Sequence, residues 1–186
     1  MSTAPSPPPS EVARIIVIMG VSSSGKTAVG KALGRRLHAP FLDGDDFHPP
    51  ANKEKMRAGI PLTDADRWPW LEALGLALRD AARSKGVAVG ACSALRRSYR
   101  DLLRKTVQEP LLFVHLHGEK AVIAERMARR SHEYMPASLL DSQFSTLEMP
   151  EADEQVMTIS VLEPVESTAD RIARSLNHLK SFRRQQ

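Results

Sequence analysis

Cysteine, aromatic residues and long apolar runs are scarce in this sequence of 186 residues. Cys92 is the only cysteine, so no disulfide can form within the chain, which is typical of a reducing compartment. No apolar run approaches the ~18 residues of a membrane span, and the start of the chain lacks the layout of a secretory signal. We therefore expect a cytoplasmic protein with no membrane segment.

The composition otherwise fits one globular domain, with 42% hydrophobic and 26% charged residues. Residues 1–12 differ from the rest, because Pro5, Pro7, Pro8 and Pro9 lie among small polar residues. This segment is predicted to be a disordered tail that does not join the fold. Residues 13–182 are predicted to form a single domain.

The most informative motif follows an apolar, β-branched run at residues 15–19. Residues 20–27 read Gly-Val-Ser-Ser-Ser-Gly-Lys-Thr and match the phosphate-binding P-loop pattern G-x-x-x-x-G-K-[ST]. A helical apolar pattern comes next, so the motif lies in its required setting of strand, loop and helix. Loop amides favour an anion there, Lys26 can reach the β- and γ-phosphates as a catalytic residue, and Thr27 can bind Mg²⁺. The predicted ATP-binding residues are Gly20, Val21, Ser22, Ser23, Ser24, Gly25, Lys26, Thr27 and Ala28.

The net charge of +4 does not require a nucleic-acid partner. The basic residues are spread along the chain among acidic ones, and ATP with an anionic substrate accounts for the surplus equally well. We expect small-molecule ligands and no nucleic acid.

Apolar runs and helical patterns alternate along the chain. Strands are predicted at residues 15–19, 40–42, 87–92, 111–116 and 156–161, with helices between them, one of which has Pro69 as its first residue. This alternation predicts an α/β class: a P-loop, nucleoside-kinase-like three-layer fold with a mostly parallel five-stranded sheet and helices on both faces. The polar, irregular stretch at residues 131–152 is predicted to form a small lid.

Two motifs of other P-loop classes are absent. The strands at residues 87–92 and 111–116 end without the carboxylate that holds Mg²⁺ in many P-loop ATPases. The guanine signature Asn-Lys-x-Asp is missing, since Asn52-Lys53 is followed by Glu54 and Lys55. These features favour a small-molecule kinase, in which a carboxylate after the second strand serves both metal and acceptor.

Three further blocks of sequence resemble the gluconokinases. The first is Asp43-Gly-Asp-Asp-Phe-His-Pro49 with Asp64-Ala-Asp-Arg-Trp-Pro-Trp-Leu71. The second is Cys92-Ser-Ala-Leu-Arg96 with Tyr99-Arg-Asp101, and the third is Leu139-Leu140 with Ser142-Gln-Phe144 and Thr146-Leu-Glu148. The resemblance implies ATP-dependent phosphorylation of D-gluconate at its 6-hydroxyl, giving 6-phospho-D-gluconate, and a homodimer.

In such a kinase, Asp43 is the candidate to organise Mg²⁺ together with Thr27. Asp45 is the candidate to orient and deprotonate the acceptor hydroxyl, and so to be both catalytic and substrate-binding. The alternatives are a solvated turn for Asp43 and a helix cap for Asp45.

A gluconate pocket needs a cation for the carboxylate and several hydrogen-bonding groups. Arg67 and Arg96 are the candidates for the carboxylate, and His48 is the candidate for a substrate hydroxyl. Ion pairs with surface acids are the alternative for the arginines, and helix capping is the alternative for His48.

Arg126 and Arg130 precede the lid stretch and share a helical face. In this class of kinase an arginine at this place closes over the phosphates, so both are candidate catalytic and ATP-binding residues. The alternative is a basic helix C-terminus that compensates the helix dipole.

Two other functions compete with gluconate phosphorylation. One is a related small-molecule kinase, such as one that acts on shikimate. The other is a nucleotide-binding regulatory protein without turnover, against which the intact Lys26, Thr27, Asp43 and Asp45 argue.

Overall fold

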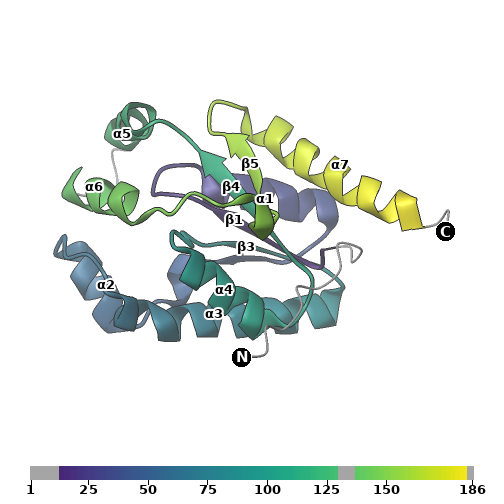
Figure 1. Ribbon diagram of the computed structural model, residues 1–186, viewed down its shortest axis with the longest axis horizontal. Helices are drawn as coiled ribbons and strands as arrows, with labels where there is room; N and C mark the ends of the chain where they lie inside the picture. Colours follow the sequence, from purple (N-terminus) through teal and green to yellow (C-terminus); the bar gives the residue numbers. More distant parts are fainter. Residues whose placement is uncertain (1–12, 130–136, 184–186) are drawn as a thin grey trace.

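The computed structural model describes residues 13–129 and 137–183, and the predicted tail at residues 1–12 lies outside them. Its centre is a sheet of five parallel strands in the order β2-β3-β1-β4-β5 (Figure 1). The predicted α/β class and five-stranded sheet are confirmed, and every pairing in the sheet is parallel. The strands are β1 (Ile15–Met19), β2 (Phe41–Asp43), β3 (Ala88–Ala91), β4 (Leu111–His117) and β5 (Met157–Ser160).

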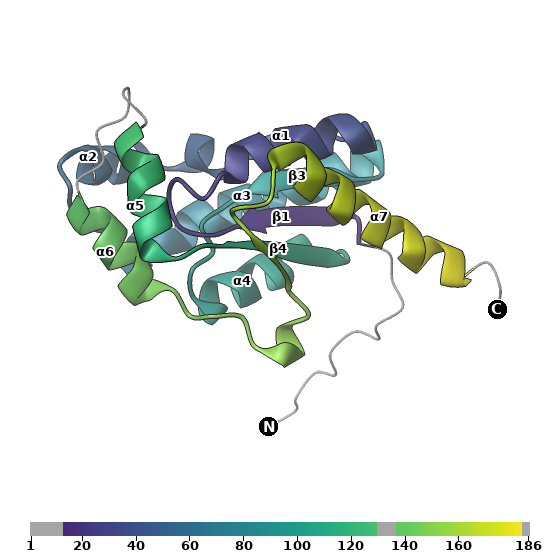
Figure 2. The same ribbon diagram turned by 90° about the horizontal axis from the view of Figure 1, so that it is seen from above.

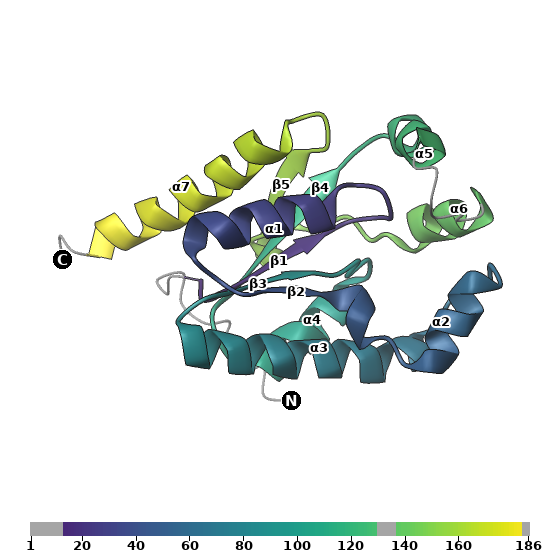
Figure 3. The ribbon, with the colours of Figure 1, turned by 180° about the vertical axis from the view of Figure 1, so that it is seen from behind.

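The central strand β1 is buried on both faces, as its continuous apolar sequence predicts. Ile16 and Ile18 belong to one core cluster, with residues of α1 (Lys26–Leu37) and α7 (Val165–Arg183). Alternate residues such as Val17 belong to a second cluster, with α3 (Asp64–Lys85) and α4 (Arg97–Val107). Figures 1 and 3 show the resulting three layers, with α1 and α7 on one side of the sheet and α3 and α4 on the other.

Three more helices gather where the parallel strands end. They are α2 (Pro50–Arg57), α5 (Lys120–Arg129) and α6 (Ala137–Thr146), and Figure 2 shows them at one end of the molecule. The 3₁₀ helix η1 (Gly44–Phe47) follows β2, and the 3₁₀ helix η2 (Ala152–Glu154) precedes β5. Because ligands of open parallel sheets bind beyond the carboxyl ends of the strands, α2, α5, α6 and η1 frame the expected site, whereas η2 lies at the amino end of β5.

The helix α3 begins earlier than the sequence analysis predicted. Thr63 and Asp66 form a capping box, in which the Thr63 hydroxyl accepts from the Asp66 N–H and the Asp66 carboxylate accepts from the Thr63 N–H. The helix therefore starts at Asp64, and the prediction that Pro69 is its first residue is wrong, since Pro69 lies inside it. Although α3 has 22 residues, neither it nor any other helix in the described ranges is apolar enough to cross a membrane.

The prediction of an irregular stretch at residues 131–152 is wrong for residues 137–146, which form α6. Leu139 and Leu140 are buried, and Leu140 belongs to the core cluster that α1 and α7 share. Phe144 and Leu147 pack against the same cluster, so Leu140, Phe144 and Leu147 follow a helical spacing of four and three residues that the sequence analysis did not use. That the segment acts as a lid stays a prediction.

A buried ion pair attaches the segment after α6 to α4. The Arg100 guanidinium donates to both carboxylate oxygens of Glu154, at 2.6 and 2.8 Å, and to the carbonyls of Ala94 and Leu95. The Arg100 side chain is 0% exposed and that of Glu154 is 1% exposed. The hydrogen bonds from Arg100 lower the pKa of Glu154 to about 2, so the carboxylate stays charged at neutral pH.

Replacing Glu154 by alanine should destabilise the fold by about 3–5 kcal/mol, because a buried guanidinium then loses its counter-charge. Denaturant unfolding measures the loss. Asp101→Ala is the control, since Asp101 pairs with Arg104 at an exposed position and should contribute little. Similar losses of unfolding free energy for the two variants would show that burial does not determine how much the Arg100–Glu154 pair contributes to stability.

Candidate active site

The phosphate-binding loop connects β1 to α1 and uses glycine where the backbone requires it. Gly20 has a φ of 144°, and a Cβ there would lie 2.9 Å from the carbonyl oxygen of Leu116. Gly25 has a φ of 97° and forms the N-cap of α1. Both values lie in the region that favours glycine, so the two glycines of the motif fix the path of the loop. The first turn of α1 carries Lys26 and Thr27.

Lys26 and Thr27 contact different parts of the site. The Lys26 Nζ donates to the carbonyl of Val21 at 2.9 Å, so the ammonium lies over its own loop. The Thr27 hydroxyl donates to Asp43 Oδ2 at 2.8 Å. This hydrogen bond joins the phosphate-binding loop to the end of β2, and it brings together the two residues that the sequence analysis assigned to Mg²⁺.

The second oxygen of Asp43 has a structural role. Asp43 Oδ1 accepts from the Asp45 N–H at 3.1 Å, which makes Asp43 the N-cap of η1. A helix cap is the alternative role for Asp45, and in the structure Asp43 has that role. Asp45 therefore lies in the first turn of η1, two residues beyond a carboxylate held by Thr27.

Cys92 shows that these charged groups converge at the end of β3. The pKa of the Cys92 thiol is raised to about 12, chiefly by burial. A hydrogen bond with the backbone of Ala94 and the charge of Lys26 lower this pKa, and the charges of Asp45 and Asp43 raise it. All three charges are thus close enough to act on one buried sulfur. The thiol is protonated at neutral pH and is not a nucleophile.

Trp70 holds the turn that carries Asp43 and Asp45. Its indole Nε1–H donates to the carbonyl of Gly44 at 2.6 Å, and the ring is 3% exposed. Gly44 must lack a side chain, because a Cβ there would lie 2.4 Å from the carbonyl oxygen of Ala91. The stretch Asp43-Gly-Asp is therefore fixed by close contact with β3 on one side and by α3 on the other.

His48 stacks on Trp70, the residue that holds this turn. Its ring lies 4.0 Å from that of Trp70 between centroids, and its Nδ1 lies 3.3 Å from Asn52 Nδ2. His48 is only 7% exposed, and burial, followed by the charges of Lys53 and Arg67, lowers its pKa to about 4. Its described contacts are structural, and its bond to a substrate hydroxyl stays a prediction.

The two arginines predicted to bind a carboxylate meet around one acid and one ring. Arg96 donates to Asp64 Oδ2 at 3.1 Å, and Arg67 donates to the Tyr99 hydroxyl at 3.0 Å. The Tyr99 hydroxyl in turn donates to Asp64. Both guanidinium carbons lie against the Tyr99 ring, at 5.3 Å for Arg67 and 6.0 Å for Arg96 from its centroid.

Asp64 and Tyr99 were missed as site residues, although both lie in the blocks that resemble gluconokinases. An acid that opens a helix is usually read as a favourable charge near the dipole, and a tyrosine as core. Their shared contacts with Arg67 and Arg96 appear only when α3 and α4 pack together. The alternative of ion pairs with acids thus applies here, because Arg96 pairs with Asp64, and such pairing also orients the guanidinium.

Of the two candidate arginines that precede the lid stretch, the structure describes Arg126 on α5. Arg126 donates to the carbonyl of Val161, just beyond β5, and Arg129 pairs with Glu125 at 2.5 Å on the helix surface. Arg130 lies outside the described residues. The contact of Arg126 with the end of β5 keeps its helix beside the sheet, and a role over the phosphates stays a prediction for both candidates.

A residue of α6 reaches the phosphate-binding loop and was not predicted to do so. Gln143 Oε1 accepts from the Ser22 N–H at 2.6 Å, and Gln143 Nε2 donates to the Ser22 hydroxyl at 2.9 Å. These two hydrogen bonds connect the loop to a segment 121 residues further along the chain. No period or spacing in the sequence pairs positions that lie this far apart.

Comparison with known proteins agrees with this geometry. The family model described as shikimate kinase matches residues 22–174. A gluconokinase of Gluconobacter oxydans is 50% identical over 147 residues, which cover 79% of this chain and 82% of that protein. The chain belongs to the gluconokinase family.

Two solved structures show how far the likeness of this gluconokinase family member extends. An unliganded sugar kinase from Janibacter has a TM-score of 0.81 at 43% identity, covering 89% of this chain and 95% of its own. A gluconokinase from Sinorhizobium meliloti has a TM-score of 0.77 at 44% identity, covering 90% of this chain and 97% of its own. The common fold therefore includes nearly the whole chain.

Acid should destabilise this gluconokinase family member through His48. Its pKa of about 4 lies below the ordinary value of 6.5, so the unfolded chain takes up the proton first. The contribution of neutral His48 to the free energy of unfolding is fully present above pH 6.5 and should be lost as the pH falls toward 4. Buried His115, whose pKa is also lowered to about 4, acts in the same direction.

His48→Asn should therefore reduce the slope of stability against pH in this range, while the contribution of His115 remains. Urea unfolding at several pH values between 7 and 4 measures the slope for both proteins. An unchanged slope would mean that His48 is not held neutral in the folded state.

Proposed function

We propose that this chain transfers the γ-phosphoryl group of ATP to the 6-hydroxyl of D-gluconate, giving 6-phospho-D-gluconate and ADP. The observation that carries the proposal is the arrangement around Asp43. One oxygen is held by Thr27 of the phosphate-binding loop, and the other accepts from the backbone of Asp45, the candidate acceptor residue. Relatives named gluconokinase, 40–50% identical to this chain, support D-gluconate as the acceptor.

On the ATP side, the chain supplies positioning and positive charge. The loop amides and the N-terminus of α1 favour the phosphates, and Lys26 moves from the carbonyl of Val21 to the β- and γ-phosphates. Arg126 and Arg130 add positive charge as the transition state forms and help to exclude water. Because phosphoryl transfer needs little covalent chemistry from the protein, such placement is its main contribution.

Thr27 and Asp43 fit Mg²⁺. A hydroxyl and a carboxylate oxygen that lie 2.8 Å apart are the hard oxygen ligands that Mg²⁺ prefers, and water completes its shell in such sites. When bound with ATP, Mg²⁺ neutralises negative charge on the phosphate oxygens. In the described ranges no cluster of three or more metal-binding side chains occurs, which fits an ion held mainly by substrate and water.

On the acceptor side, Asp45 orients the 6-hydroxyl and takes its proton while the oxygen forms a bond to the γ-phosphorus. The bond from that phosphorus to the bridging oxygen breaks, and ADP leaves with the electron pair. Arg67 and Arg96 bind the gluconate carboxylate, and Tyr99 and Asp64 keep both guanidinium groups in place. His48 binds a hydroxyl along the sugar acid.

A cytoplasmic location and a homodimer are the further parts of this proposal. Both rest on the resemblance to gluconokinases, and a buried, protonated thiol at Cys92 suits a reducing compartment. Size-exclusion chromatography with light scattering tests the dimer.

Shikimate as acceptor is the competing activity, because the matching family model is that of shikimate kinase. A panel of D-gluconate, other sugar acids and shikimate, with ADP release as the signal, separates these activities from each other and from a nucleotide-binding protein without turnover.

Lys26→Ala should abolish ADP release while leaving the fold intact, because Lys26 is half-buried and belongs to neither core cluster. Turnover and thermal unfolding are measured on the same preparation. Lys31→Ala, one turn further along α1, is the matched control and should keep wild-type turnover. Activity of Lys26→Ala near the wild-type level would remove the P-loop assignment.

Asp45→Asn should lower the gluconate-dependent rate by ~10²-fold or more, the usual contribution of a positioned general base. ATP affinity should barely change, because Lys26 and the loop still hold the phosphates. Arg67→Lys should instead raise KM for gluconate with a smaller effect on kcat, since a point charge cannot replace a two-pronged clamp.

Steady-state kinetics with each substrate varied in turn distinguishes the two variants. If Asp45 served only the backbone of η1, asparagine would replace it with near-normal turnover and a small loss of thermal stability. That pattern would overturn the assignment of Asp45 as the base.

A further inference from the structure

We propose that Gln143 and Glu148 are positioning residues, and that the turn between them links the phosphate-binding loop to Arg96. The inference rests on the proposed function, in which Arg96 binds the carboxylate of the acceptor. It assigns to the end of α6 a coupling of the ATP and gluconate subsites.

The first contact is at the phosphate-binding loop. Both polar atoms of the Gln143 amide are used, since Oε1 accepts from the Ser22 N–H at 2.6 Å and Nε2 donates to the Ser22 hydroxyl at 2.9 Å. Such a two-point contact fixes position as well as distance, because moving Gln143 breaks both bonds at once. Ser22 lies in the middle of the loop that receives the phosphates, so a shift of this loop is felt by Gln143.

The second contact is at Arg96. The Glu148 N–H donates to the carbonyl of Leu95 at 2.8 Å, and Glu148 Oε2 accepts from the Arg97 N–H at 2.8 Å. Arg96 lies between these two bonds and is the N-cap of α4, with no side-chain cap of its own. Glu148 therefore supplies the missing cap from another segment, and it holds the backbone of Arg96 on both sides.

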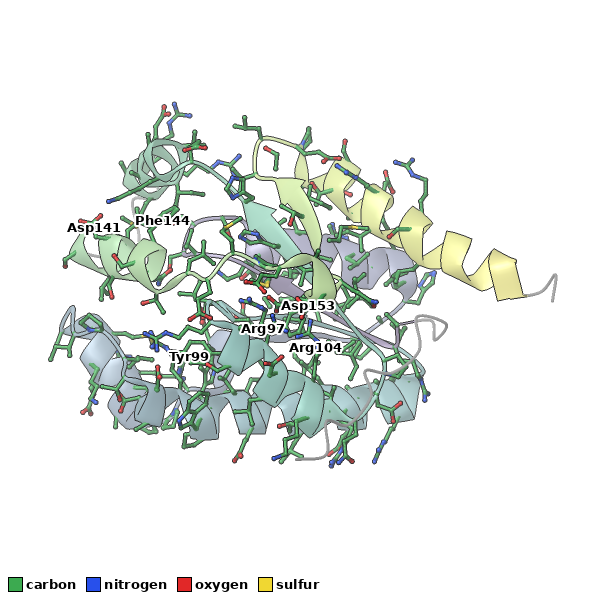
Figure 4. All side chains as sticks on the ribbon, viewed as in Figure 1. Arg97, Tyr99, Arg104, Asp141, Phe144 and Asp153 are labelled. Atoms are coloured by element: carbon green, nitrogen blue, oxygen red, sulfur yellow. The ribbon has the colours of Figure 1, made fainter. Side chains whose placement is uncertain are left out.

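The two contacts are joined by one helical turn. The carbonyl of Gln143 accepts from the Leu147 N–H at 2.9 Å, and the Thr146 hydroxyl donates to the carbonyl of Ser142 at 2.8 Å. Gln143 and Glu148 thus keep a fixed separation. Figure 4 labels Arg97 and Tyr99 on α4 and Phe144 on α6.

Coupling follows from this geometry. If ATP fixes the phosphate-binding loop, it also fixes Gln143, Glu148 and the backbone of Arg96, so that part of the ordering needed for gluconate is already complete. Gluconate should then bind more tightly when the nucleotide is present, and by linkage the nucleotide should bind more tightly when gluconate is present.

Isothermal titration of the full chain tests the coupling. The gluconate Kd is measured alone and with Mg²⁺ and adenylyl imidodiphosphate, an ATP analogue that is not hydrolysed. We expect the analogue to tighten gluconate binding to the wild-type protein by about fivefold or more. Gln143→Ala should remove most of this gain while gluconate alone binds as before, because the contact at Arg96 is intact.

Glu148→Ala should weaken gluconate binding in both conditions, remove most of the gain from the analogue and raise KM for gluconate, while the affinity for the analogue without gluconate is unchanged. Glu148→Gln should restore the wild-type values, since its amide oxygen can still accept from the Arg97 N–H. Asp153→Ala is the matched control: Asp153 also contacts Arg97, but at the guanidinium, and leaves the backbone of Arg96 untouched. This variant should bind gluconate like the wild type.

The possible failures are distinguishable. If wild-type gluconate affinity does not respond to the analogue, or if Gln143→Ala keeps the full gain, the coupling is overturned while the proposed function stands. If Glu148→Ala only lowers the melting temperature, Glu148 is structural and does not position Arg96. If the wild-type protein neither binds nor phosphorylates gluconate, the proposed function fails and the inference fails with it.

Discussion

The hydrogen bond from Thr27 to Asp43 joins the two halves of this site, and most other contacts keep its two ends in place. Thr27 is held because α1 starts at a left-handed Gly25 and packs on the sheet. Asp43 is held because the next residue, Gly44, touches β3 and accepts the indole N–H of Trp70. The order β2-β3-β1-β4-β5 makes this possible, since β3 alone separates β1 from β2 and the parallel strands end at the same edge.

The helix α4 shows how stability and function share one element. Adjacent residues of α4 have different roles. The Tyr99 hydroxyl accepts a hydrogen bond from Arg67 and donates one to Asp64, whereas Arg100 is fully buried against Glu154. The buried pair costs desolvation, which only good geometry offsets, and here the guanidinium also satisfies two backbone carbonyls. A helix fixed in this way presents Tyr99 and the preceding Arg96 with little freedom, and this rigidity is what a binding site for a flexible, open-chain acceptor needs.

The sheet, the P-loop and the pairing of Thr27 with Asp43 were predictable, because strand–loop–helix patterns and motif spacing are local properties of sequence. Helix boundaries were less so: Pro69 suggested a helix start, but the capping box of Thr63 and Asp66 outweighed it. The helix α6 was missed although Leu140, Phe144 and Leu147 have helical spacing and pack on the core, because the helix is only 10 residues long and polar residues fill the positions between them. Contacts such as Gln143 with Ser22 could not be predicted at all, since they depend on how distant segments pack.

The charge of the acceptor cluster bears on which molecules it can accept. Within the described ion pairs, Arg67 and Arg96 share the single carboxylate of Asp64, which gives this cluster an excess of one positive charge. Arg67 is the more covered of the two arginines, with a side chain that is 13% exposed. A neutral sugar would leave that charge without a partner in a partly desolvated place, whereas a sugar acid with one carboxylate balances it. Asp64 also prevents the two guanidinium groups from repelling each other when the site is empty. Under the proposed function, selection of an anionic acceptor therefore arises from the charges within α3 and α4, while the phosphate-binding loop is common to kinases of many acceptors.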